Sequence, residues 1–433
     1  MSTPSFPISA CRASIAPSIT PPYPAIASSM SIDDTSRSET SMANSRGPSV
    51  LFKLLDASVY YPIFDTIVSY LGFDDIARLS FTCRTLSILP RQIINRECNV
   101  DRNLQNWFTD PKKARSVMAE QNAVIGSHFS TALFSREFET AGLRFYVTIG
   151  DQATALEDYL RFEGYSEVPK IEPKAESRRK KYARIASPYY IEIRLCSNSP
   201  IGAFLAAVNT THLLNLVTSH RAYSLFPKAS FMNKISFITR DLATESVQHT
   251  LARYSIHGYD FQPVLWSASP QPYTQEISSP RRFGDKLCWI IEFDNVGVSE
   301  PTVPKFVVES TCFRLSVTPD SSLSLNRQPN YALSRYRLSC SAFKSCVLKY
   351  TYTFGCSAWR NYIGARVDAL TKLELYKLPP KDRANLDMTL KKDFYTLEGQ
   401  FQKPARWKYR DDLLREWWED WVKRDAMTNA HKA

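Results

Sequence analysis

Apolar residues between positions 58 and 90 recur at the spacing of a helix face, three and four residues apart. The first such set is Phe64, Ile67, Val68 and Leu71. The second set is Ile76, Leu79, Cys83 and Leu86. Gly72 separates the two sets, and Asp74 or Asp75 can cap the second helix. The pattern therefore predicts a pair of short helices.

Further along the chain, segments with helical spacing of apolar residues alternate with segments in which apolar residues recur at every second position. Helices are predicted over 91–107, 110–121 (opened by Asp110-Pro111), 128–134, 153–162 and 201–217. Strands are predicted over 123–125, 143–147 and 190–195, and a polar, basic connector over 169–184. This strand–helix–strand order is typical of a small α/β domain with one sheet.

The pattern is weaker after residue 220. It predicts a helix over 241–254 and strands over 288–293, 305–317 and 341–352, while 365–376 fits either structure. Residues 411–424 form an amphipathic helix, and its apolar face consists of Leu414, Trp417, Trp418, Trp421 and Val422. We expect this face to pack on the protein itself, the alternative being a partner-binding helix.

Composition narrows the class of protein. Lys plus Arg number 54 against 43 Asp plus Glu, giving a net charge of +11. This excess suits acidic partners such as nucleic acid, although a mild basic excess on a soluble protein is the simpler interpretation. No apolar stretch is long enough to predict a membrane span, and residues 1–50, rich in Ser and Pro, predict a disordered tail. Scattered cysteines and histidines predict no metal site, cofactor or disulfide framework, so we expect a cytoplasmic or nuclear protein.

The helix pair resembles an F-box. The resemblance rests on Pro62 in the first helix, on Tyr70-Leu71, on the Asp-capped second helix, and on Thr82-Cys83-Arg84-Thr85-Leu86. It implies docking onto the Skp-type adaptor of a cullin–RING ubiquitin ligase. The contact residues implied by motif position are Pro62, Ile63, Phe64, Ile67, Leu71, Ile76 and Leu79. The alternative is a helix pair packed only within the chain.

A second resemblance covers much of the region between residues 60 and 295. Val124-Ile125-Gly126-Ser127, followed by Gly142 to Val147, is similar to the opening of a nucleotidyltransferase fold, as it occurs behind an F-box in a fungal-type group. Ala222-Tyr223-Ser224-Leu225-Phe226-Pro227 and Arg282-Phe283-Gly284-Asp285 are similar to later segments of that group. The resemblance implies a strand that carries two aspartates.

Here the two aspartate positions are Gly142 and Arg144. Transfer by two metal ions needs carboxylates at both, and a cation would be repelled by Arg144, since unit charges about 4 Å apart interact by about 4 kcal/mol at an effective dielectric of about 20. Glu192 alone cannot replace them, so we predict no enzyme activity. The vestigial nucleotide site is Gly126, Ser127, Gly142, Arg144 and Glu192. Its Gly126-Ser127 turn is either simple turn punctuation or a cradle for an anion.

One further cluster is strongly basic. It consists of Arg178, Arg179, Lys180, Lys181 and Arg184. A solvated loop is the simpler interpretation, and a nuclear-import signal or a nucleic-acid patch is the alternative.

The expected fold class is α+β: an F-box-like helical module, a small mixed-sheet nucleotidyltransferase-like domain and an α+β extension. The expected boundaries are 1–50 for the tail, 51–108, 109–240, 241–400, and 401–433 for the last helix. The expected function is a non-enzymatic substrate receptor of a ubiquitin ligase, with an unknown protein substrate and no membrane partner. The alternative is a protein that binds nucleic acid or a nucleotide through its basic surface, and a third hypothesis is an active transferase that depends on Glu192.

Overall fold

The computed structural model describes residues 50–55, 59–82, 84–135, 140–169, 178–265, 276–277, 279–319, 334–384 and 401–430. The predicted tail, apart from Val50, and Cys83 therefore lie outside the described residues. Residues 50–433 group as one unit by their contacts. The fold is α+β, with a mixed sheet, as the sequence predicts.

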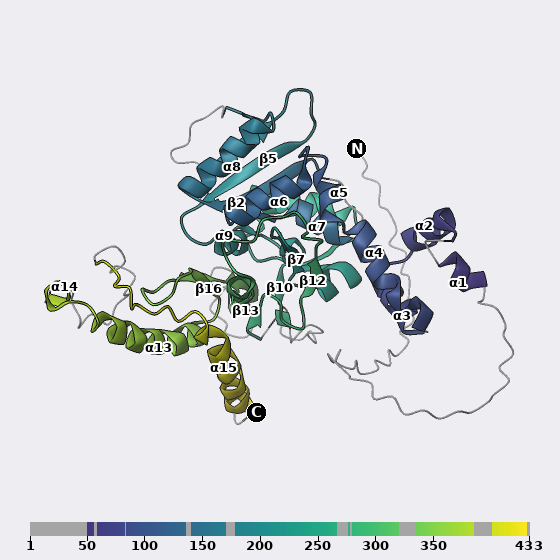
Figure 1. The fold of residues 1–433 in the computed structure, drawn as a ribbon. Helices are drawn as coiled ribbons and strands as arrows, with labels where there is room; N and C mark the ends of the chain where they lie inside the picture. Colours follow the sequence, from purple (N-terminus) through teal and green to yellow (C-terminus); the bar gives the residue numbers. More distant parts are fainter. Residues whose placement is uncertain are drawn as a thin grey trace, which may run out of the picture. The chain divides into compact units, whose positions relative to one another are not determined.

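The first described segments are short helices, shown in purple and blue in Figure 1. They are α1 (Val50–Leu54), α2 (Tyr61–Ser69), α3 (Phe73–Thr82), a 3-10 turn (Arg84–Ile88), α4 (Leu89–Glu97), α5 (Val100–Leu104) and α6 (Pro111–Glu120). α6 begins as predicted, because the Asp110 carboxylate accepts the Lys113 N–H. The single helix predicted over 91–107 is wrong: Asn99 caps a new helix by accepting the Arg102 N–H.

The cap of α3 also differs from the prediction. Neither aspartate occupies the cap position, because Gly72 precedes the helix and its carbonyl accepts the Ile76 N–H. The Asp75 carboxylate instead reaches back to the Gly72 N–H, 3.2 Å away. This is the geometry of a residue at the third helical position that closes a capping box.

A sheet of eight strands organises the middle of the chain, in the order β12-β7-β6-β1-β2-β5-β4-β3. Its strands are β1 (Val124–Gly126), β2 (Gly142–Thr148), β3 (Ser166–Glu167), β4 (Arg179–Ala183), β5 (Tyr190–Cys196), β6 (Asn215–Val217), β7 (Arg221–Ser224) and β12 (Trp289–Glu292). Only β2 and β5 run parallel, and the other neighbours are antiparallel. Because β12 pairs with β7, the sheet extends past the boundary predicted at residue 240.

Two apolar cores cover the two faces of this sheet. Alternate residues of β2 and β5, such as Leu143 and Ile193, pack with α6, α7 (His128–Ser135) and α8 (Asp151–Phe162). Figure 1 shows α6 and α8 beside β2 and β5. On the opposite face, Tyr146 packs against Phe204 of α9 (Pro200–Ala207). The cleft described below lies on this second face.

The remaining elements lie between the later strands of this sheet or after them in the chain. The helical ones are a 3-10 turn (Thr211–Leu213), a π-turn (Lys228–Met232), α10 (Glu245–Ser255), α12 (Lys305–Glu309), α13 (Ser357–Leu375), α14 (Pro380–Ala384) and α15 (Leu413–Ala430). The strands are β8 (Ile235–Phe237), β9 (Asp260–Gln262), β10 (Val264–Leu265), β11 (Arg281–Arg282), β13 (Cys312–Pro319), β14 (Ser334–Ser339), β15 (Ser341–Phe343) and β16 (Tyr352–Phe354). Most of the predicted face of α15 packs on the protein as expected, since Leu414 and Trp421 are buried with Trp359 of α13, but Val422 is 42% exposed.

Several predicted elements need correction. The connector over 169–184 contains strand β4, and the helix over 201–217 is α9, a 3-10 turn and strand β6. The strand over 305–317 begins as α12, and the strand over 341–352 is only β15 at its start. The ambiguous segment 365–376 belongs to the long helix α13. Most of these errors fall on apolar runs that suit a buried helix as well as a buried strand.

Candidate functional site: an arginine-lined cleft

The predicted vestigial site is centred on Arg144 of β2. Arg144 and Glu192 are partners in the parallel pairing of β2 with β5, so both side chains project from the same face. A guanidinium nitrogen of Arg144 lies 3.0 Å from a Glu192 carboxylate oxygen. Arg194, two residues along β5, binds the other Glu192 oxygen at 2.6 Å. One carboxylate is therefore shared by two arginines.

These charges decide the ionisation of Glu192. Burial alone would raise the pKa of Glu192, but Arg144 and Arg194 outweigh burial, and the pKa lies below its ordinary value of 4.5. Burial would likewise lower the pKa of Arg144, but Glu192 raises it overall. The carboxylate is thus held ionised between two cations, and each of its oxygens is bound by one of them.

The Gly126-Ser127 turn joins β1 to α7 beside Arg144. Ser127 has φ of +74°, a left-handed conformation that few non-glycine residues adopt. Its buried hydroxyl accepts a hydrogen bond from Arg144 at 3.2 Å. Gly126 is required by packing, because a Cβ there would lie 2.5 Å from the Phe204 ring. The structure therefore brings Gly126, Ser127, Arg144 and Glu192 together, as predicted for a single site.

Gly142 stands at the start of β2, and the space that a side chain would need at this position is already filled. A Cβ at this position would lie 2.6 Å from the ring of Tyr190, its partner on β5. The Lys181 ammonium in turn covers that ring at 4.1 Å. The position where the resemblance implies an aspartate is thus closed by an aromatic ring and a cation.

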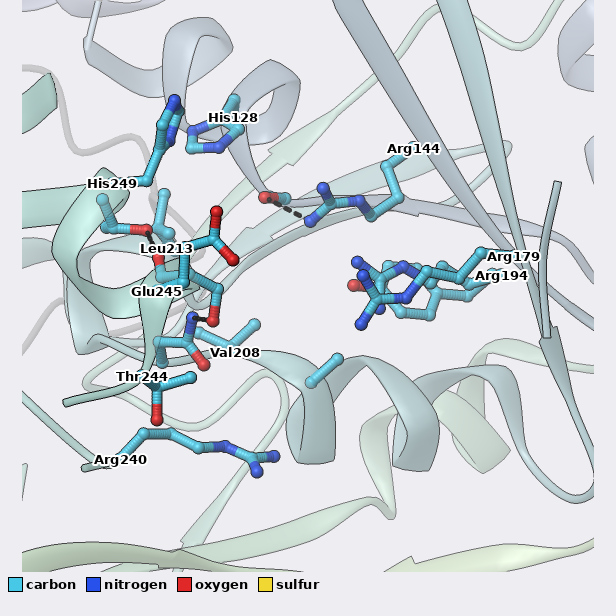
Figure 2. A pocket seen from close by; sticks show the side chains of 16 residues that line it. His128, Arg144, Arg179, Arg194, Val208, Leu213, Arg240, Thr244, Glu245 and His249 are labelled. Atoms are coloured by element: carbon cyan, nitrogen blue, oxygen red, sulfur yellow. Dashed lines mark hydrogen bonds between the residues drawn. The ribbon is translucent and has the colours of Figure 1, made fainter. Parts of the chain in front are cut away.

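Arg144 lines a cleft of about 530 Å³ that is walled on the other side by residues beyond β7. Figure 2 shows Arg144, Arg179 and Arg194 on one wall and Glu245, Thr244 and His249 on the other. The polar lining residues are Ser127, His128, Arg144, Tyr146, Arg179, Arg194, Asn209, Arg240, Thr244, Glu245, Ser246, His249 and Thr250. The cleft therefore combines several guanidinium groups with hydroxyl and amide groups.

His128, at the edge of the cleft, adds no positive charge at neutral pH. Burial, with Arg253, Arg144 and His249 nearby, lowers the pKa of His128 to about 3. Its Nδ1 lies 2.7 Å from the Tyr254 hydroxyl. Burial also raises the pKa of Tyr254, so this is a hydrogen bond between two neutral groups. The charge of the cleft comes from its arginines.

The basic cluster predicted as a solvated loop lies on strand β4 and its flanks, and its members point in different directions. Lys180 faces α8 and binds both carboxylate oxygens of Glu157, at 2.7 and 2.9 Å. Arg184 binds the Glu163 carboxylate at 2.8 Å. Arg179 lines the cleft, Lys181 covers Tyr190, and Arg178 lines a separate cavity beside Cys196.

The predicted adaptor-binding residues also differ from one another, in how far each is exposed. Phe64 and Ile76 are 1% exposed and form the small core of the helix pair with Val68, Leu89 and Ile93. Leu71 and Leu79 pack against that core and are partly buried, as is Ile67. Pro62 and Ile63 are exposed. The structure therefore gives Phe64 and Ile76 a structural position and leaves the others at or near the surface.

Sequence reasoning missed part of the cleft. Arg194 could have been found, because it follows Glu192 at the period of two that already linked Gly142 to Arg144. Arg240, Glu245 and His249 carry no such signal, since they come from the segment around α10, far away in sequence. Among the described residues, no group of three His, Cys, Asp or Glu side chains is arranged to hold a metal ion.

Comparisons with known proteins add little. No family model matches the chain, and no curated protein matches it. A solved structure of a CCA-adding enzyme with CTP is similar over 38% of this chain and 43% of its own, with 12% identity and a TM-score of 0.29. That similarity is too low to carry an argument about function. In the part of the chain that the structure describes, no helix is long and apolar enough to cross a membrane.

Proposed function

We propose that this protein is a non-enzymatic, F-box-like adaptor whose helix pair docks onto a Skp-type adaptor of a cullin–RING ligase. The observation that carries the proposal is an apolar stripe on α2 that the protein leaves at its surface. Ile63 is 44% exposed and Tyr70 is 84% exposed, with the partly buried Ile67 between them. These three residues lie four and three apart, so they share one face of the helix.

The same helix has a second apolar stripe, and this one holds the module together. Phe64 and Val68 are buried at 1% exposure, and Leu71 packs against them. A short helix needs one such stripe to pack on its own protein. Two adjacent stripes, one buried and one exposed, are what a helix needs in order to be anchored and also bind a partner.

The helical module exposes further apolar residues. Within the helical module, Val59, Tyr61, Phe81 and Ile88 are 53%, 51%, 78% and 54% exposed. A stable protein–protein interface buries about 800 Å² on each partner and gains most of its affinity from a few large apolar and aromatic residues. Exposed tyrosine, phenylalanine and isoleucine side chains suit such an interface.

The non-enzymatic part of the proposal is supported by the cleft face of β2. The two positions at which the resemblance implies aspartates hold Gly142, which is covered by Tyr190, and Arg144, which is paired with Glu192. The pairing of β1 antiparallel to β2, and of β2 parallel to β5, supports the nucleotidyltransferase-like scaffold suggested by the sequence. In our proposal this scaffold serves recognition and not transfer.

The nucleic-acid alternative receives less support from the basic cluster. Lys180 is bound to Glu157 of α8 and Arg184 to Glu163 just after it, so the cluster does not form one continuous cationic surface. Extended binding of a phosphate backbone needs several cations aligned along its path.

The test is binding of the full chain to a purified Skp-type adaptor, measured by surface plasmon resonance. Ile63→Asp/Tyr70→Asp should weaken binding by about 100-fold or more, because it places charges in the centre of the proposed interface. Both side chains are exposed, so the variant leaves the core around Phe64 intact.

The matched control is Phe162→Asp/Ile185→Asp. These two apolar residues are 84% and 97% exposed but lie outside the helical module. The control should bind like the wild type. No wild-type binding, or equal loss in the two double variants, would contradict the adaptor proposal.

A further inference from the structure

Another cavity, of about 500 Å³, lies in the C-terminal part of the chain, where strands β13 and β14 meet the start of helix α13. Its lining includes three arginines, Arg314 on β13, Arg337 on β14 and Arg360 on α13. No aspartate or glutamate is among the described residues that line it. This cavity shares no residue with the cleft at Arg144, so its charge is a separate feature of the molecule.

The pairing of β13 with β14 explains why two of the arginines meet here. Arg314 pairs with Ser339, and Ser316 pairs with Arg337, in the antiparallel register. All four side chains therefore leave one face of the strand pair. The two arginines are diagonal neighbours on that face, a separation that long side chains can bridge. The face presents two guanidinium groups and the Ser339 hydroxyl to the cavity.

The start of helix α13 lies close against this strand pair because residue 355 is a glycine. A Cβ at Gly355 would collide with the Ser339 carbonyl oxygen and lie 2.5 Å from the Phe313 Cα. The close approach brings Arg360, in the first turn of α13, to the cavity. That turn contains no acidic residue, and the Cys356 side chain does not cap it. A cation in the first turn opposes the helix dipole, so both contribute positive potential at the same place.

The described part of the chain does not neutralise these three cations. Among the described residues, the side chains of Arg314, Arg337 and Arg360 have no ion pair and no hydrogen bond. Arg314 is partly buried, and its Nε–H is enclosed without an acceptor. A guanidinium group that is partly withdrawn from water without a counter-charge costs free energy. An anion in the cavity would offset this cost and the repulsion among the three arginines.

The donors of the cavity suit a tetrahedral oxyanion. A guanidinium group presents a planar fork of N–H donors that matches phosphate oxygens, often with two parallel hydrogen bonds. The hydroxyls of Ser339 and Ser357, which also line the cavity, are further donors. These donors approach from a sheet face and from a helix end. They can therefore surround an ion more fully than the two coplanar oxygens of a carboxylate require.

We infer that this cavity binds a phosphate or sulfate group, free or on a small ester, through Arg314, Arg337 and Arg360. The inference goes beyond the adaptor proposal and does not depend on it, because the exposed stripe on α2 and this cavity share no residue.

The test is isothermal titration calorimetry of the full chain, in a chloride buffer of constant ionic strength. The probes are inorganic phosphate, sulfate, O-phosphoserine and acetate. We expect saturable binding of phosphate, of sulfate or of both, and at least about tenfold weaker binding of acetate. O-phosphoserine that binds at least as tightly as phosphate would identify an ester as the source of the group, and weaker binding a free ion. Either result supports the inference.

The variants are Arg337→Gln and Arg360→Gln, which both alter exposed residues and should leave the fold intact. Each should weaken binding of the inorganic anion by about tenfold, the cost of one charge-assisted contact. The matched control is Arg240→Gln, which removes an exposed arginine from the other cleft and should bind like the wild type. Ile63→Asp/Tyr70→Asp should also bind the anion normally, so that failure of the adaptor proposal and failure of this inference are distinguishable.

Four results would overturn the inference. They are no saturable binding of phosphate or sulfate, binding of acetate as tight as that of either anion, an effect of Arg337→Gln and Arg360→Gln no larger than that of Arg240→Gln, and tighter binding of a short RNA than of every probe. The last result would assign the cavity to a nucleic-acid surface.

Discussion

Cations on the two faces of strand β4 are paired with carboxylates in different ways. On the face toward α8, Lys180 binds both oxygens of the buried Glu157 carboxylate. On the cleft face, Arg179 stands beside Arg194, and Arg194 and Arg144 share the single Glu192 carboxylate. Charge that serves the fold is neutralised by the chain itself. On the cleft face, one carboxylate is instead shared between two arginines.

Substitutions at two adjacent residues of β4 should have very different effects on the free energy of unfolding. Lys180→Gln should lower the free energy of unfolding by about 1–3 kcal/mol, because it leaves the buried Glu157 carboxylate without its main partner. Arg179→Gln should change it by less than about 0.5 kcal/mol, since Arg179 is an exposed residue. Urea unfolding of both variants measures the difference. Equal losses at the two positions would show that both faces of β4 are structural.

A smaller effect is expected in the dependence of stability on pH. Burial would raise the pKa of Glu192, but Arg144 and Arg194 lower it below the ordinary 4.5. Folding therefore favours the ionised form, and the stabilisation is present above pH 4.5 and lost as the pH falls through the lowered pKa. Glu192→Gln should flatten the fall of unfolding free energy on acidification below pH 4.5.

The control for this experiment is Asp158→Asn. Its carboxylate is 62% exposed in a surface ion pair with Arg161, where solvent screens the interaction. An acid slope that is flattened equally by both variants, or by neither, would mean that Glu192 is not held between the two arginines as the structure shows.

Local signals in the sequence were sufficient for the elements that build the arginine wall. The turn at Gly126-Ser127 and the alternation of Leu143, Phe145 and Val147 predicted β1, α7 and β2. The resemblance to a nucleotidyltransferase fold, and not local pattern, assigned Glu192 of the strand predicted over 190–195 to the same site as Arg144. These segments carry clear turn residues and a clean period of two, so local pattern and final structure agree.

Elsewhere local pattern was ambiguous. The predicted strand over 305–317 starts as helix α12, because a single turn of Lys305–Glu309 buries the adjacent Val307 and Val308 before strand β13 begins. Helix α13 has a clear apolar face at Trp359, Ile363 and Val367, and Val367 already lies within the ambiguous segment 365–376. The far wall of the cleft comes from residues around α10, and only long-range packing brings them opposite β2.

The central claim is that the chain keeps the site of a transferase-like fold but has exchanged metal binding for arginines. Titration of Mn²⁺ into the full chain, with free Mn²⁺ followed by electron paramagnetic resonance, tests it most directly, first alone and then with ATP. The account predicts no saturable Mn²⁺ site on the protein in either case. Single-site Mn²⁺ binding that Glu192→Gln abolishes would contradict it and would revive an active transferase.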